Sequence, residues 1–237
     1  SSSAASDVYK RQRKIFHGIE SPHQMTSIQC GEVEAVHKVT TANVYAQQLV
    51  EVEGQTDILT MGIPYICPYN VHSIMNPILV MCTGLGYFFN LYRGKPLVRE
   101  GGVVILTHPT TNEFNPVHHP SYIDFFEEVL ADTTDPHVMS QRWEQQYAED
   151  DWYRHLYRTT NAYHGVHPFY MWYWGSHGMK HVGKVIIVGG DAATVRKLGF
   201  TPASTMNDAL EIASDTVGRS PTITHIKTPP LMIADVK

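Results

Sequence analysis

The sequence contains little cysteine, no block of basic residues and no long apolar run. Its three cysteines, among 237 residues, have a spacing that fits neither a disulfide framework nor a cysteine-based zinc site. The net charge of −5 comes without the Lys/Arg stripe typical of nucleic-acid binding. The most apolar run, residues 78–89, is too short to cross a bilayer. These absences predict a cytoplasmic globular protein that binds neither nucleic acid nor membrane.

The first twelve residues, SSSAASDVYKRQ, have neither the apolar core of a secretory signal nor the periodicity of a helix or strand. Translated back into codons, residues 2–12 can be read as the DNA adapter of transposase-based sequencing libraries. We therefore expect residues 1–12 to be an adapter-like, non-native segment. On this interpretation the native protein begins upstream of Arg13, and the chain is the C-terminal part of a longer protein.

Apolar segments alternate with helical patterns along the rest of the chain. β-Branched and apolar runs bounded by glycine or proline predict strands at 49–54, 57–64, 101–109, 184–191 and 221–230. Helices are predicted at 31–48, 73–92, 120–130, 135–149 and 205–218, with one or two more in 152–174. Residues 73–92 contain Pro77, where we expect the helix to start or kink.

Three helix starts carry capping signals. Ser121 with Asp124 and Thr205 with Asp208 have capping-box spacing, and Asp135 precedes a proline that suits the first helical position.

Strands that are apolar throughout and separated by helices indicate a parallel sheet covered on both faces. The predicted fold class is therefore α/β, with a Rossmann-like three-layer arrangement of about four to five parallel strands and helices on both faces. We assign residues 13–55 to a helix and strand that link to a missing N-terminal domain. Residues 56–237 form the predicted C-terminal α/β domain.

Histidine and tyrosine are unusually frequent, with 14 and 13 copies. Ligands of open parallel sheets bind beyond the carboxyl ends of the strands, which draws attention to the loops 63–73, 107–120 and 189–191. His108 directly follows a buried strand, and a binding role and a packing role are equally supported for it. His118 and His119 could bind metal, but adjacent side chains rarely converge on one ion, so capping or surface roles are favoured. A packed aromatic corner is also the favoured interpretation of His164 and His167.

The order of several segments resembles the C-terminal half of the lactate racemase family, the nickel-pincer nucleotide enzymes. GEVEAVHK resembles the family's G-D-x-x-x-V-H helix start, VREGGVVIL its v-r-d-G-G-x-I-I strand, and HGVHPFYM its G-H-K-A helix. YIDFFEEVL stands where the family has a short F-x-x-W helix, and VIIVGGDAATVRKLGFTPASTMNDALEIA parallels the family's ending. The matching segments run from about Gly31 to the end of the chain.

This resemblance implies that the whole protein is an isomerase, a racemase or epimerase that interconverts stereoisomers of a 2-hydroxy acid. In the family, a nickel-carrying pyridinium cofactor takes hydride from the α-carbon while a histidine removes the hydroxyl proton. The family's covalent lysine, nickel ligand and catalytic histidines lie upstream of the matching segments. The expected partners of this chain are thus a small 2-hydroxy acid and its own N-terminal domain, which carries the nickel-pincer nucleotide.

One family segment with active-site residues, D-x-N-L-Y-Q-A-Q-K, matches YNVHSIMNP. Asn70 matches the family's asparagine, and His72 replaces its tyrosine. Ser73 and Met75 stand at the two glutamine positions, and Asn76 stands at the lysine. Because asparagine offers a carboxylate only a neutral hydrogen bond, the resemblance leaves the identity of the 2-hydroxy acid open.

The candidate substrate-binding residues are Asn70, His72, Ser73, Met75, Asn76, His108, His118 and His119, and no metal ligand or catalytic residue is assigned. Two alternatives stay open. The protein could be a relative that binds a small acid without turnover, or an unrelated α/β enzyme with a histidine-bound divalent metal.

Overall fold

The computed structural model describes residues 25–71, 73–227 and 232–237, so the adapter-like segment 1–12 lies outside the described residues. The chain divides into two compact units, residues 1–47 and 48–237. Among the helices described, none combines the length and the apolar character needed to cross a membrane. In the first unit, helix α2 (Val33–Gln48) confirms the helix predicted at 31–48, and none of its residues is buried.

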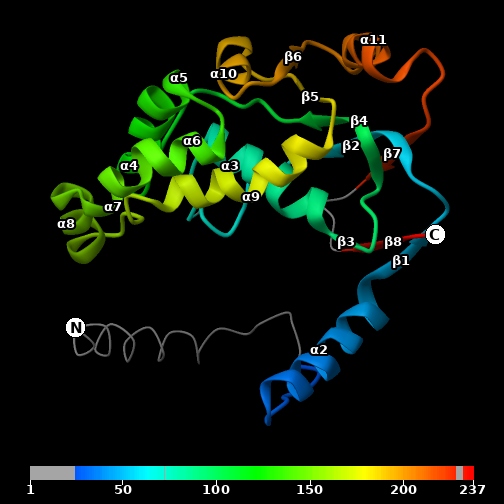
Figure 1. The fold of residues 1–237 in the computed structure, drawn as a ribbon, viewed down its shortest axis with the longest axis horizontal. Coiled ribbons are helices and arrows are strands. Elements are labelled where there is room, and N and C mark those ends of the chain that lie inside the picture. Colours follow the sequence, from blue (N-terminus) through cyan, green and yellow to red (C-terminus); the bar gives the residue numbers. More distant parts are fainter. Residues whose placement is uncertain (1–24, 72, 228–231) are drawn as a thin grey trace. The chain divides into compact units, whose positions relative to one another are not determined.

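A five-stranded parallel sheet forms the centre of the second unit (Figure 1). Its strands are β2 (Thr56–Gly62), β4 (Val98–Thr107), β5 (Lys184–Val188), β6 (Thr201–Ala203) and β7 (Ile223–Ile226), in the order β6-β5-β4-β2-β7. Each neighbouring pair is parallel. The predicted α/β class and the parallel sheet are therefore confirmed.

Both faces of this sheet are buried. Successive side chains of a strand point to opposite faces, and those of β2 and β4 enter a hydrophobic cluster on each side. Ile58, Val103 and Ile105 pack in one cluster with helix α11 (Met206–Val217). Leu59 and Val104 belong to a larger cluster on the other face, with residues of the helices that precede and follow β4. Strands that are apolar at nearly every position follow from this three-layer arrangement.

The helix predicted at 73–92 is shorter and less regular than expected. It begins at Pro77, because the Asn76 side chain accepts a hydrogen bond from Leu79 N at 3.0 Å and caps α3 (Pro77–Met81). A π-helical segment η1 (Cys82–Tyr87) and a 3-10 turn η2 (Phe88–Asn90) follow. Gly84 lies in η1, where a Cβ atom would be 2.8 Å from the Leu106 side chain. A side chain there would push this segment away from the sheet.

The other helices lie at α4 (Pro120–Asp124), η3 (Phe125–Val129), α5 (Leu130–Asp132), α6 (Pro136–Met139), η4 (Ser140–Glu144), α7 (Gln145–Glu149), α8 (Asp151–Thr159), α9 (His167–His181) and α10 (Ala192–Lys197). The predicted caps Asp135 and Thr205 are confirmed, the latter within a complete capping box. The cap predicted at Ser121 is wrong. Pro120 already occupies the first turn, and the Ser121 hydroxyl donates to His164 O instead.

A second, three-stranded parallel sheet has the order β1-β8-β3. It joins β1 (Leu49–Val52), β3 (Tyr92–Arg93) and β8 (Ile233–Val236). Only β1 was expected from the sequence. We assigned it to the segment 13–55 that links to another domain, and it pairs with β8 inside the second unit.

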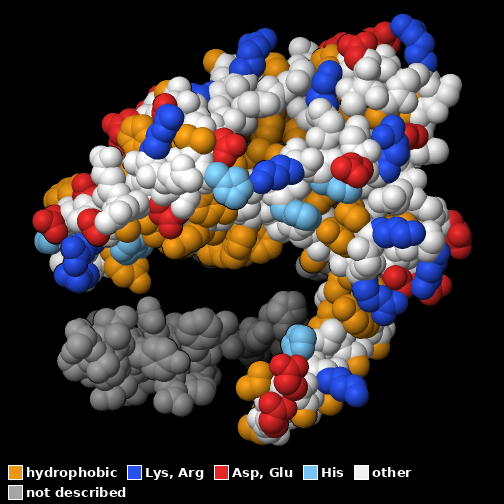
Figure 2. Space-filling view, viewed as in Figure 1, with side chains coloured by type: hydrophobic (Ala, Val, Ile, Leu, Met, Phe, Trp, Pro, Cys, Tyr) orange, Lys and Arg blue, Asp and Glu red, His pale blue; other side chains and the backbone are white. Residues whose placement is uncertain are grey.

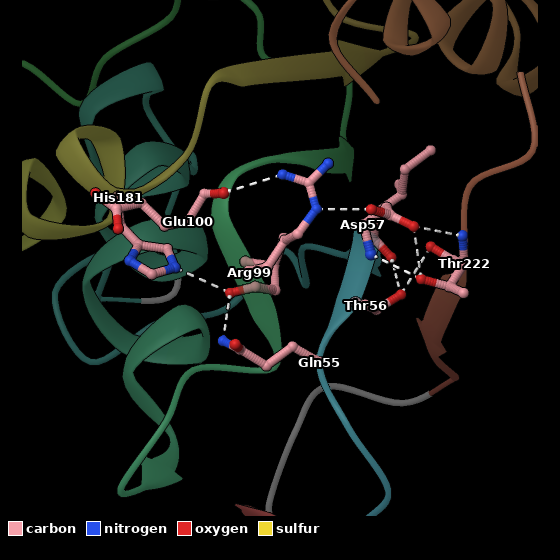
Figure 3. Close-up of polar contacts among 9 residues, drawn as sticks. Gln55, Thr56, Asp57, Arg99, Glu100, His181 and Thr222 are labelled. Atoms are coloured by element: carbon pink, nitrogen blue, oxygen red, sulfur yellow. Dashed lines mark hydrogen bonds and ion pairs between the residues drawn. The ribbon is translucent and has the colours of Figure 1, made fainter. Parts of the chain in front are cut away.

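An ionic network fastens the amino ends of three strands of the larger sheet (Figure 3). The Asp57 carboxylate on β2 accepts from Arg99 Nε on β4 at 2.7 Å. Its other oxygen accepts from both N and Oγ1 of Thr222, just before β7, at 2.8 Å each. Hydrogen bonds from Thr222 and Arg99 lower the pKa of Asp57 from 3.8 to about 2. This network therefore holds β2, β4 and β7 in register at the edge opposite the candidate loops.

Candidate functional site

The three candidate loops leave the sheet on one side, at the carboxyl ends of β2, β4 and β5, which we call the carboxyl edge. Gly62, Thr107 and Val188 end neighbouring strands in register. Hydrogen bonds continue the pairing into the loops, from Ile63 N to Thr107 O at 3.1 Å and from His108 N to Val188 O at 3.3 Å. The carboxyl edge of β2, β4 and β5 thus brings together the loops that the sequence analysis selected.

His108 directly follows strand β4 and is buried. Its side chain is 5% exposed. Thr110 N donates a hydrogen bond to His108 Nδ1 at 2.9 Å. Because a backbone N–H can only donate, Nδ1 is the unprotonated nitrogen and Nε2 carries the proton of the neutral ring. That Nε2–H group is buried and has no partner in the described part of the chain.

Burial also fixes the charge of His108. Desolvation lowers the pKa of the imidazole from 6.5 to about 4, so the ring is neutral at pH 7. An unpaired buried donor costs about 1–3 kcal/mol. His108 is therefore a neutral hydrogen-bond donor available for an acceptor oxygen. It is not a base at Nε2, because that nitrogen already holds its proton.

The backbone beside His108 is strained. Thr110 is fully buried and has φ of +44°, a left-handed conformation that is rare for a β-branched residue. Val71, in the loop after β2, has φ of +50°. These are the two non-glycine residues with positive φ among those that the structure describes. Both lie in the candidate loops, and strain of this kind is concentrated at functional sites in proteins.

The loop after β2 places an aromatic ring against His108. The ring centroids of Tyr65 and His108 are 5.2 Å apart, and the Tyr65 side chain is 70% exposed. Asn70 holds the backbone of this loop, because its Nδ2 donates to Tyr65 O and Ser73 O and its Oδ1 accepts from Cys67 N. Ser73 Oγ donates to Asn70 O. The side chains of Asn70 and Ser73 thus fix the loop that presents Tyr65.

The other candidates of this loop have different surroundings. Met75 is buried in the larger hydrophobic cluster. Asn76 caps α3 through Oδ1, while its buried Nδ2 has no partner in the described chain. His72 lies outside the described residues. A substrate-binding role for these residues stays a prediction.

His118 and His119 each have a backbone carbonyl within hydrogen-bond distance. Nδ1 of His118 lies 3.2 Å from Asn161 O, and Nε2 of His119 lies 2.8 Å from Tyr69 O. His119 is fully buried, and its Nδ1 has no partner in the described chain. Burial lowers the pKa of His119, so this ring is also neutral at pH 7. Their roles as substrate-binding residues stay predictions.

His167 packs in an aromatic corner with this pair. Its ring stacks on Tyr163 at 4.3 Å, and Tyr163 stacks in turn on His119 at 5.5 Å. Its Nδ1 lies 2.5 Å from the Tyr122 hydroxyl. This geometry matches the packed-corner interpretation of His167.

A cavity of about 370 Å³ lies at the carboxyl ends of β5 and β6. Its lining includes Gly189, Gly190 and Arg196. Gly190 separates this cavity from the strained loop, since a Cβ atom there would be 3.4 Å from Thr110 Cβ. Gly189 has φ of +76°, and Asp191 caps the next helix by accepting from Thr194 N. The glycines therefore serve a tight strand-to-helix turn.

Sequence reasoning missed Tyr65 and Thr110. Tyr65 is one of 13 tyrosines, and no spacing distinguishes it. The conformation of Thr110 has no sequence signal, because threonine rarely adopts positive φ. In the described residues, no three His, Cys, Asp or Glu side chains are placed to hold one metal ion.

Neither a family model nor a curated protein sequence matches the chain. Among solved structures, the fold is similar to the lactate racemase apoprotein from Thermoanaerobacterium thermosaccharolyticum, with 18% sequence identity and a TM-score of 0.49. The similarity covers 91% of this chain and 44% of that protein. The chain therefore spans less than half the length of the racemase that it resembles.

Proposed function

We propose that this chain is a domain of an isomerase that acts on 2-hydroxy acids, and that the carboxyl edge of its five-stranded sheet forms part of the substrate site. The observation that carries the proposal is the buried, unpartnered Nε2–H of His108 at this edge. The collinear sequence segments shared with the lactate racemase family support the class of reaction.

The chemistry of His108 suits such a substrate. A 2-hydroxy acid offers hydroxyl and carboxylate oxygens as acceptors, and the corresponding 2-oxo acid offers a carbonyl oxygen. A donor held in a dry, preorganised position orients an oxygen without reorganising when the ligand binds. Because the ring is neutral, it binds the oxygen without transferring a proton. We therefore assign His108 a role in orienting the substrate.

The described residues supply no ligand set for nickel. We therefore assign the nickel-pincer nucleotide and its ligands to protein segments outside the described residues. The chain by itself is expected to bind the acid and not to racemise it.

The alternative of binding without turnover uses the same donor. Nε2 of His108 already carries its proton, so His108 cannot remove the hydroxyl proton of a substrate. Under this alternative, the longer protein would bind the acid through the same donor and have no activity. Both candidates share the His108 site and differ in what the rest of the protein contains.

A racemisation assay separates them. The chain alone and the extended reading frame, supplied with nickel-pincer nucleotide, are each incubated with single enantiomers of several 2-hydroxy acids, and the products are resolved by chiral chromatography. We expect the extended protein to produce the opposite enantiomer and the chain alone to leave the substrate unchanged. Racemisation by the chain alone, or none by the loaded extended protein, would contradict the proposed function.

A further inference from the structure

We infer that the site at His108 prefers a 2-hydroxy acid with an aromatic side chain, which packs against the Tyr65 ring while an oxygen of the acid accepts the His108 Nε2–H. This inference rests on the proposed function and adds the substrate class. It depends on the contact between the two rings, on the exposed side chains around them and on the absence of charge in the loop.

Tyr65 has a backbone that is held in place and an aromatic ring that is left uncovered. Asn70 binds its carbonyl oxygen at 2.9 Å, which fixes the backbone, while the ring stays 70% exposed. The ring lies against the imidazole of His108, with an angle of 47° between the two planes. Because it is so exposed, the Tyr65 ring is the part of the cover over His108 that can move at little packing cost. A ligand that displaces it sideways meets both the ring and the donor.

The same loop carries further exposed apolar side chains. Ile66, Val71 and Ile74 are all exposed. Figure 2 shows hydrophobic side chains gathered along the side of the second unit where Figure 1 draws α9 and the loop that leads into α3. Contiguous exposed apolar surface of this kind marks binding sites in soluble proteins.

The loop has no lysine or arginine to hold a carboxylate. Residues 63–76 contain no Lys, Arg, Asp or Glu. Burial lowers the pKa of His108 to about 4, so this ring offers the carboxylate a neutral hydrogen bond. With a neutral donor as the polar contact, affinity must come from apolar contact. The methyl group of lactate provides little of that contact, whereas a phenyl group covers the Tyr65 ring.

Isothermal titration calorimetry of the full chain with L-lactate and L-phenyllactate tests the inference. We expect phenyllactate to bind about tenfold more tightly than lactate, the gain typical of one aromatic pair. Tyr65→Ala should remove most of this preference. Tyr65→Phe, the matched control, should keep the preference because it keeps the ring. Both variants should fold, since the side chain is exposed.

The outcomes distinguish this inference from the proposed function. Equal affinity for the two acids, or a preference that survives in Tyr65→Ala, overturns the aromatic substrate class and leaves the proposed function intact. Binding of neither acid overturns both together. If both acids bind and their affinities are unchanged in His108→Ala, which has no side-chain donor, the donor plays no part in binding and both the inference and the proposed function are overturned.

Discussion

We expect the hydrogen bonds and ion pair of Asp57 to contribute measurably to the stability of the fold. Asp57→Asn replaces one carboxylate oxygen with an amide that faces donors of Arg99 and Thr222. The substituted side chain therefore loses the ion pair and at least one hydrogen bond that join β2 to β4 and β7.

The magnitude follows from the pKa. A carboxyl group whose pKa falls from 3.8 to about 2 on folding contributes at most about 2.4 kcal/mol at neutral pH. Arg99 is 42% exposed, and solvent screening reduces the contribution to about 1–1.5 kcal/mol. Because the folded pKa is the lower one, this contribution is complete above about pH 4 and is lost as the pH falls towards 2.

Urea denaturation at pH 7, 5, 4, 3 and 2.5 measures this effect. We expect Asp57→Asn to lower the free energy of unfolding by about 1–1.5 kcal/mol at pH 7 and 5, with the difference shrinking below pH 4. Asp151→Asn is the matched control, since its carboxylate is fully exposed and 3.7 Å from Arg154; it should change stability by less than about 0.5 kcal/mol. Equal stability of Asp57→Asn and wild type at pH 7, or a difference at pH 2.5 as large as that at pH 7, would refute the reasoning.

Two further substitutions test packing and strain, again by urea denaturation. Gly175→Ala places a Cβ atom 2.1 Å from Met81 Sδ, which is buried, and should lower stability by about 1–3 kcal/mol. The control Gly62→Ala, where a Cβ atom meets open space, should not destabilise the protein. Similar losses in both variants would show that the contact between α9 and Met81 is looser than described. Val71→Asn should raise stability by about 0.5–1 kcal/mol, because asparagine tolerates the positive φ of this exposed position. A loss of stability in Val71→Asn would argue against strain in the loop after β2.

Much of the fold could be predicted from local sequence. The runs that became β2, β4 and β5 are apolar at almost every position and bounded by glycine or proline, so their burial on both faces was readable. Asp135 caps its helix with the side chain, and Thr205 forms its capping box with Asp208, through contacts within three residues of each cap. Short-range chemistry of this kind needs no knowledge of the tertiary structure.

Long-range pairing could not be predicted in the same way. β3 contains two residues, and it pairs with Ala234 and Asp235, which lie far along the chain. At Ser121 the capping-box pattern competed with Pro120, which is equally suited to a first helical position. The proline determined where α4 begins.

The position of the candidate site was predictable and its chemistry was not. His108 was a candidate because it lies in the loop after a buried parallel strand, where ligands bind in open α/β sheets. Its tautomer depends on the hydrogen bond from Thr110 N, and therefore on a backbone conformation that the sequence does not indicate. The structure thus distinguishes His108 among the 14 histidines as a neutral donor whose Nε2–H group has no partner in the described chain.

The central claim is that the Nε2–H of His108 is a neutral donor for an oxygen of a 2-hydroxy acid. Imidazole ¹⁵N NMR of the chain tests it most directly, with the His108 signals assigned by comparison with His108→Asn, whose side-chain oxygen can still accept from Thr110 N. We predict an Nε2–H tautomer that does not titrate between pH 8 and 5, and an Nε2–H signal that shifts when phenyllactate is added. Titration near pH 6.5, or signals that no 2-hydroxy acid moves, would contradict the account.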